Sequence, residues 1–366
     1  MKAILSGETK GTGYQPLEPG IFTGTSAGAI NAAIMVSHSE KGSARALACL
    51  EQIWVNEFSE NTGRGGNGLF HVRLDPLRHL NLERLMANPL LPLASLADDI
   101  AALGLAFVRR GADLLLSTGS AESRAVELFD LADFIASERL GETLRRLIDL
   151  ESIRSADRKL RIAATNWSTG TVRIFANQDM CGDDGYAAIR ASAAIPGIFP
   201  PVTIRGTEYV DGGLVMNTPL KTALECGAST VHIVYLDPDI RNIPAMRLEG
   251  TLGILERSLA ISFAAKANQD VMIAGWINEG LRLSRPDLAP GAGYDKAKRA
   301  LVRTKAAGKG DEYRKVTIHR YHPRGDLAGR LGLLDFDQTA IRTLLERGYE
   351  DGIRHDCALS ECVIPG

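Results

Sequence analysis

The chain has 366 residues, 45% hydrophobic and 23% charged, which is ordinary for a globular protein long enough for one large α/β domain or two smaller ones. A net charge of −2 without a dense run of Lys or Arg argues against a nucleic-acid partner. The N-terminal apolar stretch is too short for a signal peptide. A membrane-spanning helix needs about 18 consecutive apolar residues, and no segment of the sequence provides them. We therefore expect a cytoplasmic protein, and peripheral contact with a membrane stays open.

The five cysteines are scattered and odd in number, which favours free thiols in a reducing compartment over a disulfide framework. They are Cys49, Cys181, Cys226, Cys357 and Cys362. Their spacing along the chain is not that of a metal site, and the sequence has no Walker-type or dinucleotide-binding motif. We therefore expect no metal and no cofactor.

Strands and helices interleave along most of the chain, which is typical of a layered α/β sheet protein. Strands are predicted at Lys2–Leu5, Ile21–Phe22, Lys159–Ala164, Thr171–Phe175, Val202–Ile204, Glu208–Val210, Val231–Leu236 and Val316–Tyr321. Helices are predicted at Ala27–Val36, Ser43–Phe58, Tyr186–Ala194, Pro219–Cys226, Leu252–Leu281 and Asp337–Tyr349. Residues 62–150 are mostly helical in pattern, and we interpret them as an insertion into one domain that spans residues 1–366.

The most informative motif is the pentapeptide from Gly24 to Gly28, which has the form G-x-S-x-G around Ser26. It lies between a short apolar run and a helix, the context that a nucleophile elbow requires. The N-terminus of that helix would direct free N–H groups toward an acyl oxyanion. Ser26 is therefore the candidate nucleophile.

A second motif follows far down the chain, where a predicted strand ends at Asp211 and two glycines, Gly212 and Gly213, follow. The glycines allow a sharp turn that can direct the aspartate into a cleft, although Asp-Gly is also a common dipeptide in ordinary turns. The segment Ala191–Val202, which contains Ile195-Pro196 and Phe199-Pro200-Pro201, precedes it.

Together these motifs resemble the patatin-like phospholipase family, which carries a serine elbow, a lead-in like Ala191–Val202 and an aspartate in a D-G-G or D-G-A turn. The resemblance covers residues 1–60 and 150–355. It implies a three-layer α/β sandwich with a mainly parallel central sheet and a helical insertion. It also implies a metal-independent hydrolase of phospholipid or related glycerolipid acyl esters, in which Ser26 attacks the carbonyl and Asp211 accepts its proton.

The sequence departs from this family in the glycine-rich loop after the first predicted strand. Gly7 matches the first glycine of the family's oxyanion loop, but Glu8 and Thr9 occupy the next two places. Gly11 and Gly13 are the remaining candidate donors. This departure motivates an alternative hypothesis, a catalytically weak relative that binds lipid or a protein partner.

Two further questions stay open in the sequence. A carboxylesterase with a Ser-His-Asp triad would use a late histidine, for which His319 and His322 are the candidates, although their alternation with apolar residues favours strand positions. Within the insertion, the apolar stretch from Pro89 to Leu116 is either a lid that meets lipid or a helical cap that packs on the sheet.

Overall fold

A mixed sheet forms the centre of this protein, for which we describe a computed structural model. The described residues are 1–59, 67–69, 71–72, 135–136, 138–196, 198–236, 257–258, 261–262, 265, 268, 271–276, 278–279, 315–323 and 336–365. Within them, the sheet contains β1 (Ile21–Gly24), β4 (Lys159–Asn166), β5 (Val172–Ala176), β6 (Val202–Ile204) and β7 (Thr207–Asp211). Two separate pairs are β2 (His71–Val72) with β3 (Ile135–Ala136), and β8 (Thr230–Val234) with β9 (Thr317–Tyr321).

Two strands, β1 and β7, pair with the same edge of the central strand β4. β5 pairs with Arg161–Thr165 along one edge, so β1 and β7 must both use the opposite edge. There β1 runs parallel to β4 and ends with Gly24 opposite Ile162, whereas β7 runs antiparallel and ends with Asp211 opposite Ala164. The ends of β1 and β7 therefore face each other only about 7 Å apart along β4.

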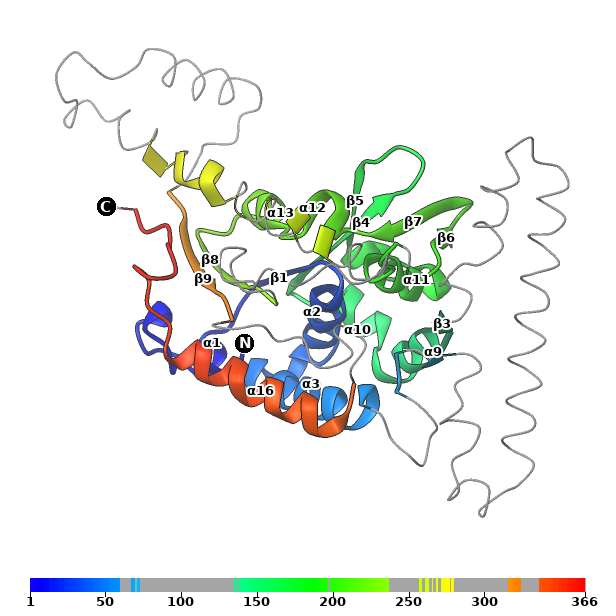
Figure 1. The fold of residues 1–366 in the computed structure, drawn as a ribbon, viewed down its shortest axis with the longest axis horizontal. Helices are drawn as coiled ribbons and strands as arrows, with labels where there is room; N and C mark the ends of the chain where they lie inside the picture. Colours follow the sequence, from blue (N-terminus) through cyan, green and yellow to red (C-terminus); the bar gives the residue numbers. More distant parts are fainter. Residues whose placement is uncertain are drawn as a thin grey trace, which may run out of the picture.

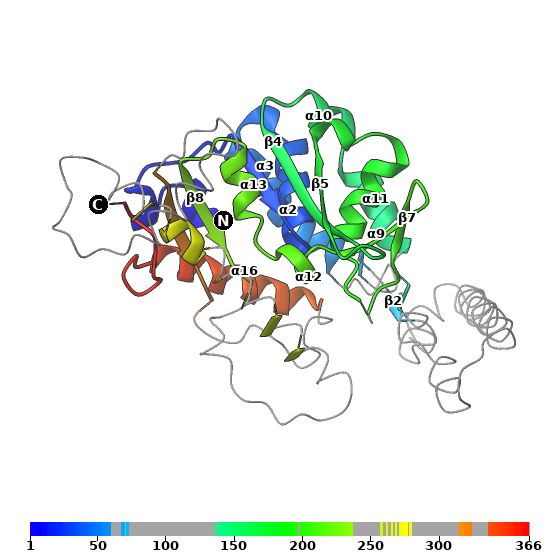
Figure 2. The ribbon, with the colours of Figure 1, turned by 90° about the horizontal axis from the view of Figure 1, so that it is seen from above.

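Helices cover both faces of this sheet. Consecutive β4 residues from Ile162 to Ala164 are fully buried, and since neighbouring side chains point to opposite faces, both faces are covered. Helices α2 (Ala27–Ser37), α11 (Gly182–Ser192) and α12 (Gly213–Met216) contact β4, and α13 (Leu220–Glu225) contacts β1. From above, β8 and α11 lie on opposite sides of β4 (Figure 2). The predicted layered α/β fold is thus confirmed.

The remaining helical segments pack around this centre (Figure 1). They are α1 (Lys2–Leu5), η1 (Lys10–Thr12), η2 (Ser39–Lys41), α3 (Ser43–Ile53), η3 (Trp54–Phe58), α9 (Glu138–Leu147), α10 (Leu150–Ser155), η4 (Asn177–Asp179) and α16 (Gln338–Ile353). At the start of α16, the Asp337 side chain accepts hydrogen bonds from the amides of Thr339 and Ala340 and so caps the helix.

The N-terminal segment corrects one prediction, because Lys2–Leu5 is the helix α1 and not a strand. The amides of Ile4 and Leu5 both donate to the carbonyl of Met1. A run this short has no periodicity that separates strand from helix, so packing decides. Its residues Ala3, Ile4 and Leu5 are buried, and α1 packs against α16.

The sheet is also more mixed than a mainly parallel one. Among its described pairs, β1 with β4 is parallel, whereas β5 and β7 are antiparallel to β4, and β6 is antiparallel to β7. Hairpin connections explain the difference, because short loops join β4 to β5 and β6 to β7.

Several predictions fall largely outside the described residues. These are the apolar stretch Pro89–Leu116 of the insertion and most of the helix predicted at Leu252–Leu281. No described helix is both long and apolar enough to cross a bilayer.

Candidate active site

Ser26 lies at a sharp turn between β1 and α2, with φ 56° and ψ −129°. A non-glycine residue at positive φ is uncommon and marks backbone strain that the surrounding structure holds in place. Gly24 makes the turn possible, because a Cβ atom there would lie 2.1 Å from the carbonyl oxygen of Gly28. The predicted strand, turn and helix are all present, and Ala27 begins α2 with the free amides of a helix N-terminus.

Asp211 ends β7 and is fully buried. Its Oδ1 accepts a hydrogen bond of 2.7 Å from the amide of Gly213, the second glycine of the turn. Gly212 cannot carry a side chain without displacement, because its Cβ would lie 2.3 Å from the carbonyl oxygen of Ala163 and 3.0 Å from Cγ2 of Thr25. The two glycines thus have different tasks: one allows close approach to β4 and the serine turn, and the other holds the carboxylate.

Burial raises the pKa of Asp211 to about 6, because the charged carboxylate loses its hydration. The Gly213 amide and the Ser26 side chain act in the opposite direction and favour the charged form. The buried Oδ2 has no hydrogen-bond partner of good geometry in the described part of the chain. The effect of Ser26 on this pKa means that its side chain lies near the carboxyl group. The unpaired Oδ2 is the oxygen that remains able to accept a proton.

The shared edge of β4 explains how two residues 185 positions apart meet. Ser26 follows the end of β1, and Asp211 is the end of β7, and these two strands end toward each other on that edge. No local feature of the sequence contains this information.

Ser192, which sequence reasoning did not single out, joins the two turns. Its carbonyl and its Oγ both accept from the amide of Ser26, at 3.0 and 3.1 Å. The same hydroxyl donates to the carbonyl of Ala163 at 2.6 Å. Two residues further on, the carbonyl of Ala194 accepts from the amide of Asp211 at 2.9 Å. The signal was present, since both residues lie in the segment Ala191–Val202 that carries the family resemblance.

The three candidate oxyanion glycines belong to the N-terminal loop before β1. Gly7 has φ 74° and packs against the backbone of Gln15. A Cβ on Gly11 would lie 2.3 Å from the hydroxyl of Tyr321 and 3.3 Å from His319 Nδ1, so this turn packs on β9. Gly13, with φ 61°, has open space where its Cβ would be. None of the described contacts links these glycines to Ser26.

The two late histidines have neighbours of their own. His319 is buried on β9 and stacks on His232 of β8, with ring centroids 4.9 Å apart. His322 stacks on Tyr235 at 4.0 Å. Their described contacts do not include Ser26 or Asp211.

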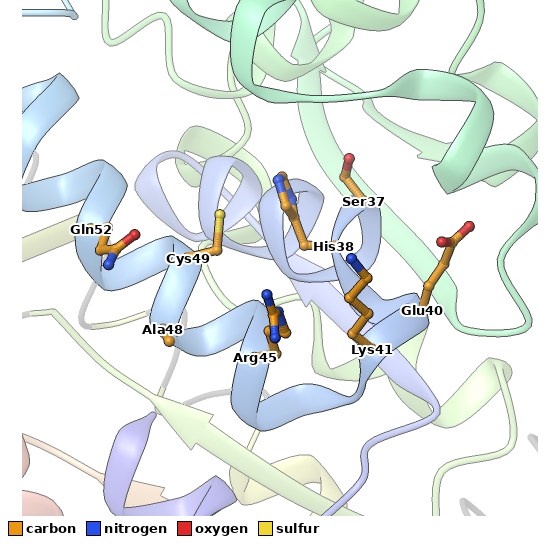
Figure 3. Close-up of a pocket in the computed structure, with 8 residues that line it drawn as sticks. All are labelled: Ser37, His38, Glu40, Lys41, Arg45, Ala48, Cys49 and Gln52. Carbon is orange, nitrogen blue, oxygen red and sulfur yellow. The ribbon is translucent and has the colours of Figure 1, made fainter.

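A cavity of about 560 Å³ lies at the C-terminal end of α2, whereas Ser26 precedes the N-terminus of that helix. Figure 3 shows the side chains that line the cavity. Its lining includes Ser37 and His38 at the end of α2 and Arg45 and Cys49 of α3. Eleven helical steps separate Ser37 from Ser26, or about 16 Å along the axis, so this cavity is not part of the Ser26 site.

Comparison with known proteins agrees with the motifs. The model of a family described as patatin-like phospholipase matches residues 12–224, more than half of the chain. The crystal structure of VipD from Legionella pneumophila is similar to 91% of this chain, at 16% sequence identity and a TM-score of 0.32. The match covers 60% of the VipD chain, so this chain spans about three-fifths of that structure.

Proposed function

Because the chain belongs to the patatin-like phospholipase family, whose members are lipid acyl hydrolases, we propose that it hydrolyses acyl esters of phospholipids or related glycerolipids. The observation that carries the proposal is the approach of Ser26, on its strained turn, to the buried carboxyl group of Asp211. The substrate is thus a lipid or another acyl ester.

In this mechanism Ser26 Oγ attacks the ester carbonyl while Asp211 accepts the hydroxyl proton. The carbonyl carbon becomes tetrahedral, and its oxyanion lies near the N-terminus of α2, where the amide of Ala27 is a suitable donor. The proton returns to the leaving alcohol as the C–O bond breaks. Water then attacks the acyl-serine by the same route, which releases the fatty acid and restores Ser26.

A pKa of about 6 suits Asp211 to this task. Near neutral pH the carboxyl group is mostly ionised and can accept a proton, yet it is a stronger base than an exposed aspartate. This two-residue mechanism requires no histidine.

The test compares hydrolysis of a medium-chain p-nitrophenyl ester by the wild type, Ser26→Ala and Asp211→Asn. We expect Ser26→Ala to reduce turnover to the background, and Asp211→Asn to reduce kcat by about 10²–10⁴-fold. His322→Gln is the matched control, and full activity in it supports the dyad. Loss of activity in a correctly folded His322→Gln would instead support a triad.

A catalytically weak lipid- or protein-binding relative is the second candidate function. The packing of Gly11 favours it, since a Cβ there would meet Tyr321, His319 and His355 and not the serine turn. A serine-directed fluorophosphonate probe separates the two: labelling of the wild type but not of Ser26→Ala supports the enzyme, and an unlabelled wild type supports the binding protein.

A further inference from the structure

A cluster of four metal-ligating side chains lies apart from Ser26 and Asp211. It consists of His319 on β9 and His355, Cys357 and Cys362 in the segment after α16. Their candidate ligand atoms all lie within 4.8 Å of one another. The proposed hydrolysis makes no use of this cluster, so it needs an explanation of its own.

We propose that these four residues bind one structural zinc ion. Two sulfur and two nitrogen ligands form a donor set that zinc accepts, and four protein ligands close the tetrahedral coordination of a structural site. Two thiolates would also balance the charge of the divalent ion.

The distances within the cluster fit a tetrahedron. Zinc bonds of about 2.3 Å to sulfur and about 2.05 Å to nitrogen place neighbouring sulfur and nitrogen ligands about 3.6 Å apart. In the structure, Cys357 Sγ lies 3.5 Å from both His319 Nδ1 and His355 Nε2, and Cys362 Sγ lies 3.5 Å from His355 Nε2. Three sulfur–nitrogen distances in the cluster thus already match those expected around one shared ion.

The groups around the cluster hold its ligands in place. Ser360 Oγ lies 3.4 Å from His355 Nδ1, so it can accept that proton and leave Nε2 for the metal. The amide of Arg320 donates to Cys362 Sγ at 3.3 Å, which stabilises a thiolate. The amide of Cys362 also donates to the carbonyl of Cys357 at 2.9 Å and closes the loop between the two cysteines. These are the outer contacts that metal sites commonly use.

The cluster joins three separate parts of the chain. The C-terminal segment is held to β9 by the two hydrogen bonds between Ile318 and Val363. The N-terminal turn covers the cluster through Gly11, and Lys10 pairs with Asp356 at 3.7 Å. Figure 1 shows this turn (blue), β9 (orange) and the C-terminal segment (red) on the same side of the molecule. A bound ion would fix all three together.

An entry path is also present. A cavity of about 510 Å³ is lined by His319, Cys357 and Cys362. An ion can therefore reach the ligands without unfolding of the segment.

The sequence hides this site because its ligands do not form one local motif. His355-x-Cys357-x4-Cys362 supplies three of them, and the fourth, His319, comes from a strand 36 residues earlier. The expectation that the cysteines have no metal role came from their spacing alone.

The first experiment measures metal in the full chain, purified under reducing conditions after growth with zinc. We expect one zinc ion per chain by mass spectrometry. After zinc is removed, Co²⁺ should give the visible and near-ultraviolet bands of tetrahedral cobalt bound to thiolates. Absence of zinc, together with no such bands on adding Co²⁺ to the reduced chain, would overturn the proposal, as would a disulfide between Cys357 and Cys362 under those conditions.

Variants then assign the ligands. Cys357→Ser and Cys362→Ser should each lower zinc affinity at least about 100-fold, whereas Cys226→Ser, outside the cluster, should retain the metal. Removal of zinc from the wild type by a chelator should lower its Tm. Because the wild-type metal content and cobalt spectrum need no variant, the proposal remains testable even if a variant fails to fold. None of these measurements depends on esterase activity.

Discussion

At the scale of single residues, Asp211 combines a functional position with a cost to stability. Its pKa is about 6 in the folded chain against 3.8 for an ordinary aspartate, because burial disfavours the charged form. The folded state therefore binds its proton more tightly than the unfolded state does. The protonated carboxyl group therefore adds to the free energy of unfolding below about pH 4, and this contribution is lost as the pH rises to about 6.

Two pH-dependent results follow for Asp211. In the wild type, kcat/KM should rise with pH through about 6 as the carboxyl group ionises. Asp211→Asn should lose most activity yet raise the free energy of unfolding at pH 7 by about 1–3 kcal/mol, since it removes a buried charge. Ester kinetics measured across the pH range in which Asp211 titrates, and urea unfolding at neutral pH, test the two results. An inactive variant that is also less stable would contradict this account.

Ser192 acts on the reaction only through the residues it positions. Ser192→Ala removes the hydroxyl between the Ser26 amide and the Ala163 carbonyl, and leaves a buried acceptor without its partner. We expect a loss of about 1–3 kcal/mol in the free energy of unfolding, and a fall in kcat with little change in KM. Ser155→Ala is the control, because the Ser155 hydroxyl donates to the carbonyl of Glu151 at an exposed position. Equal effects of the two substitutions would exclude a positioning role.

At the scale of elements, the two glycines of the pentapeptide have different roles in the turn from β1 into α2. A Cβ on Gly24 would collide with the backbone of Gly28, whereas a Cβ on Gly28 would meet nothing within 4 Å. Glycine is thus required by close packing at Gly24, whereas packing does not require it at Gly28.

Opposite changes in stability are expected for these two glycines. Gly24→Ala should lower the free energy of unfolding by about 2 kcal/mol or more, because strand and helix must separate. Gly28→Ala should raise it by about 0.5–1 kcal/mol, since alanine favours the helix more than glycine does. Denaturant unfolding of both variants measures the difference. If both change stability in the same direction, the close approach at Gly24 is not what limits the turn.

At the scale of the whole molecule, the end of the sheet that carries Ser26 and Asp211 also presents an exposed tryptophan. Trp167 follows β4, is 52% exposed, and lies about 10 Å beyond the level of Asp211 along the strand. Val215 on α12, also exposed, follows the aspartate turn. Tryptophan is favoured at the boundary between lipid and water, so we predict that this end contacts the lipid surface.

Removal of this side chain should affect lipid substrates selectively. We expect Trp167→Ala to reduce hydrolysis of phospholipid vesicles several-fold, with little change for a soluble p-nitrophenyl ester. Trp276→Ala is a matched control, because Trp276 is 54% exposed but belongs to the segment whose buried Val271 and Ala274 pack with β8 and β9. Equal loss on vesicles and on the soluble ester would place the effect at the catalytic site instead.

The sequence by itself determined the local features of this protein. The serine turn, the helix after it, most strands from Lys159 onward and the α/β class all follow from short-range patterns. Turn geometry and side-chain periodicity depend on neighbouring residues, so those patterns are sufficient. The family also follows from such motifs, and the match over residues 12–224 confirms it. The catalytic roles of Ser26 and Asp211 stay a prediction.

Only the tertiary structure decided which distant segments meet. The pairing of β1 and β7 along one edge of β4 brings Asp211 to Ser26, and the packing of the last segment on β9 brings Cys357 and Cys362 to His319. The helix at Lys2–Leu5 is a third case, because burial against α16 selects its conformation. Such outcomes depend on the free energy of burial and strand pairing summed over the whole chain, which no short stretch of sequence contains.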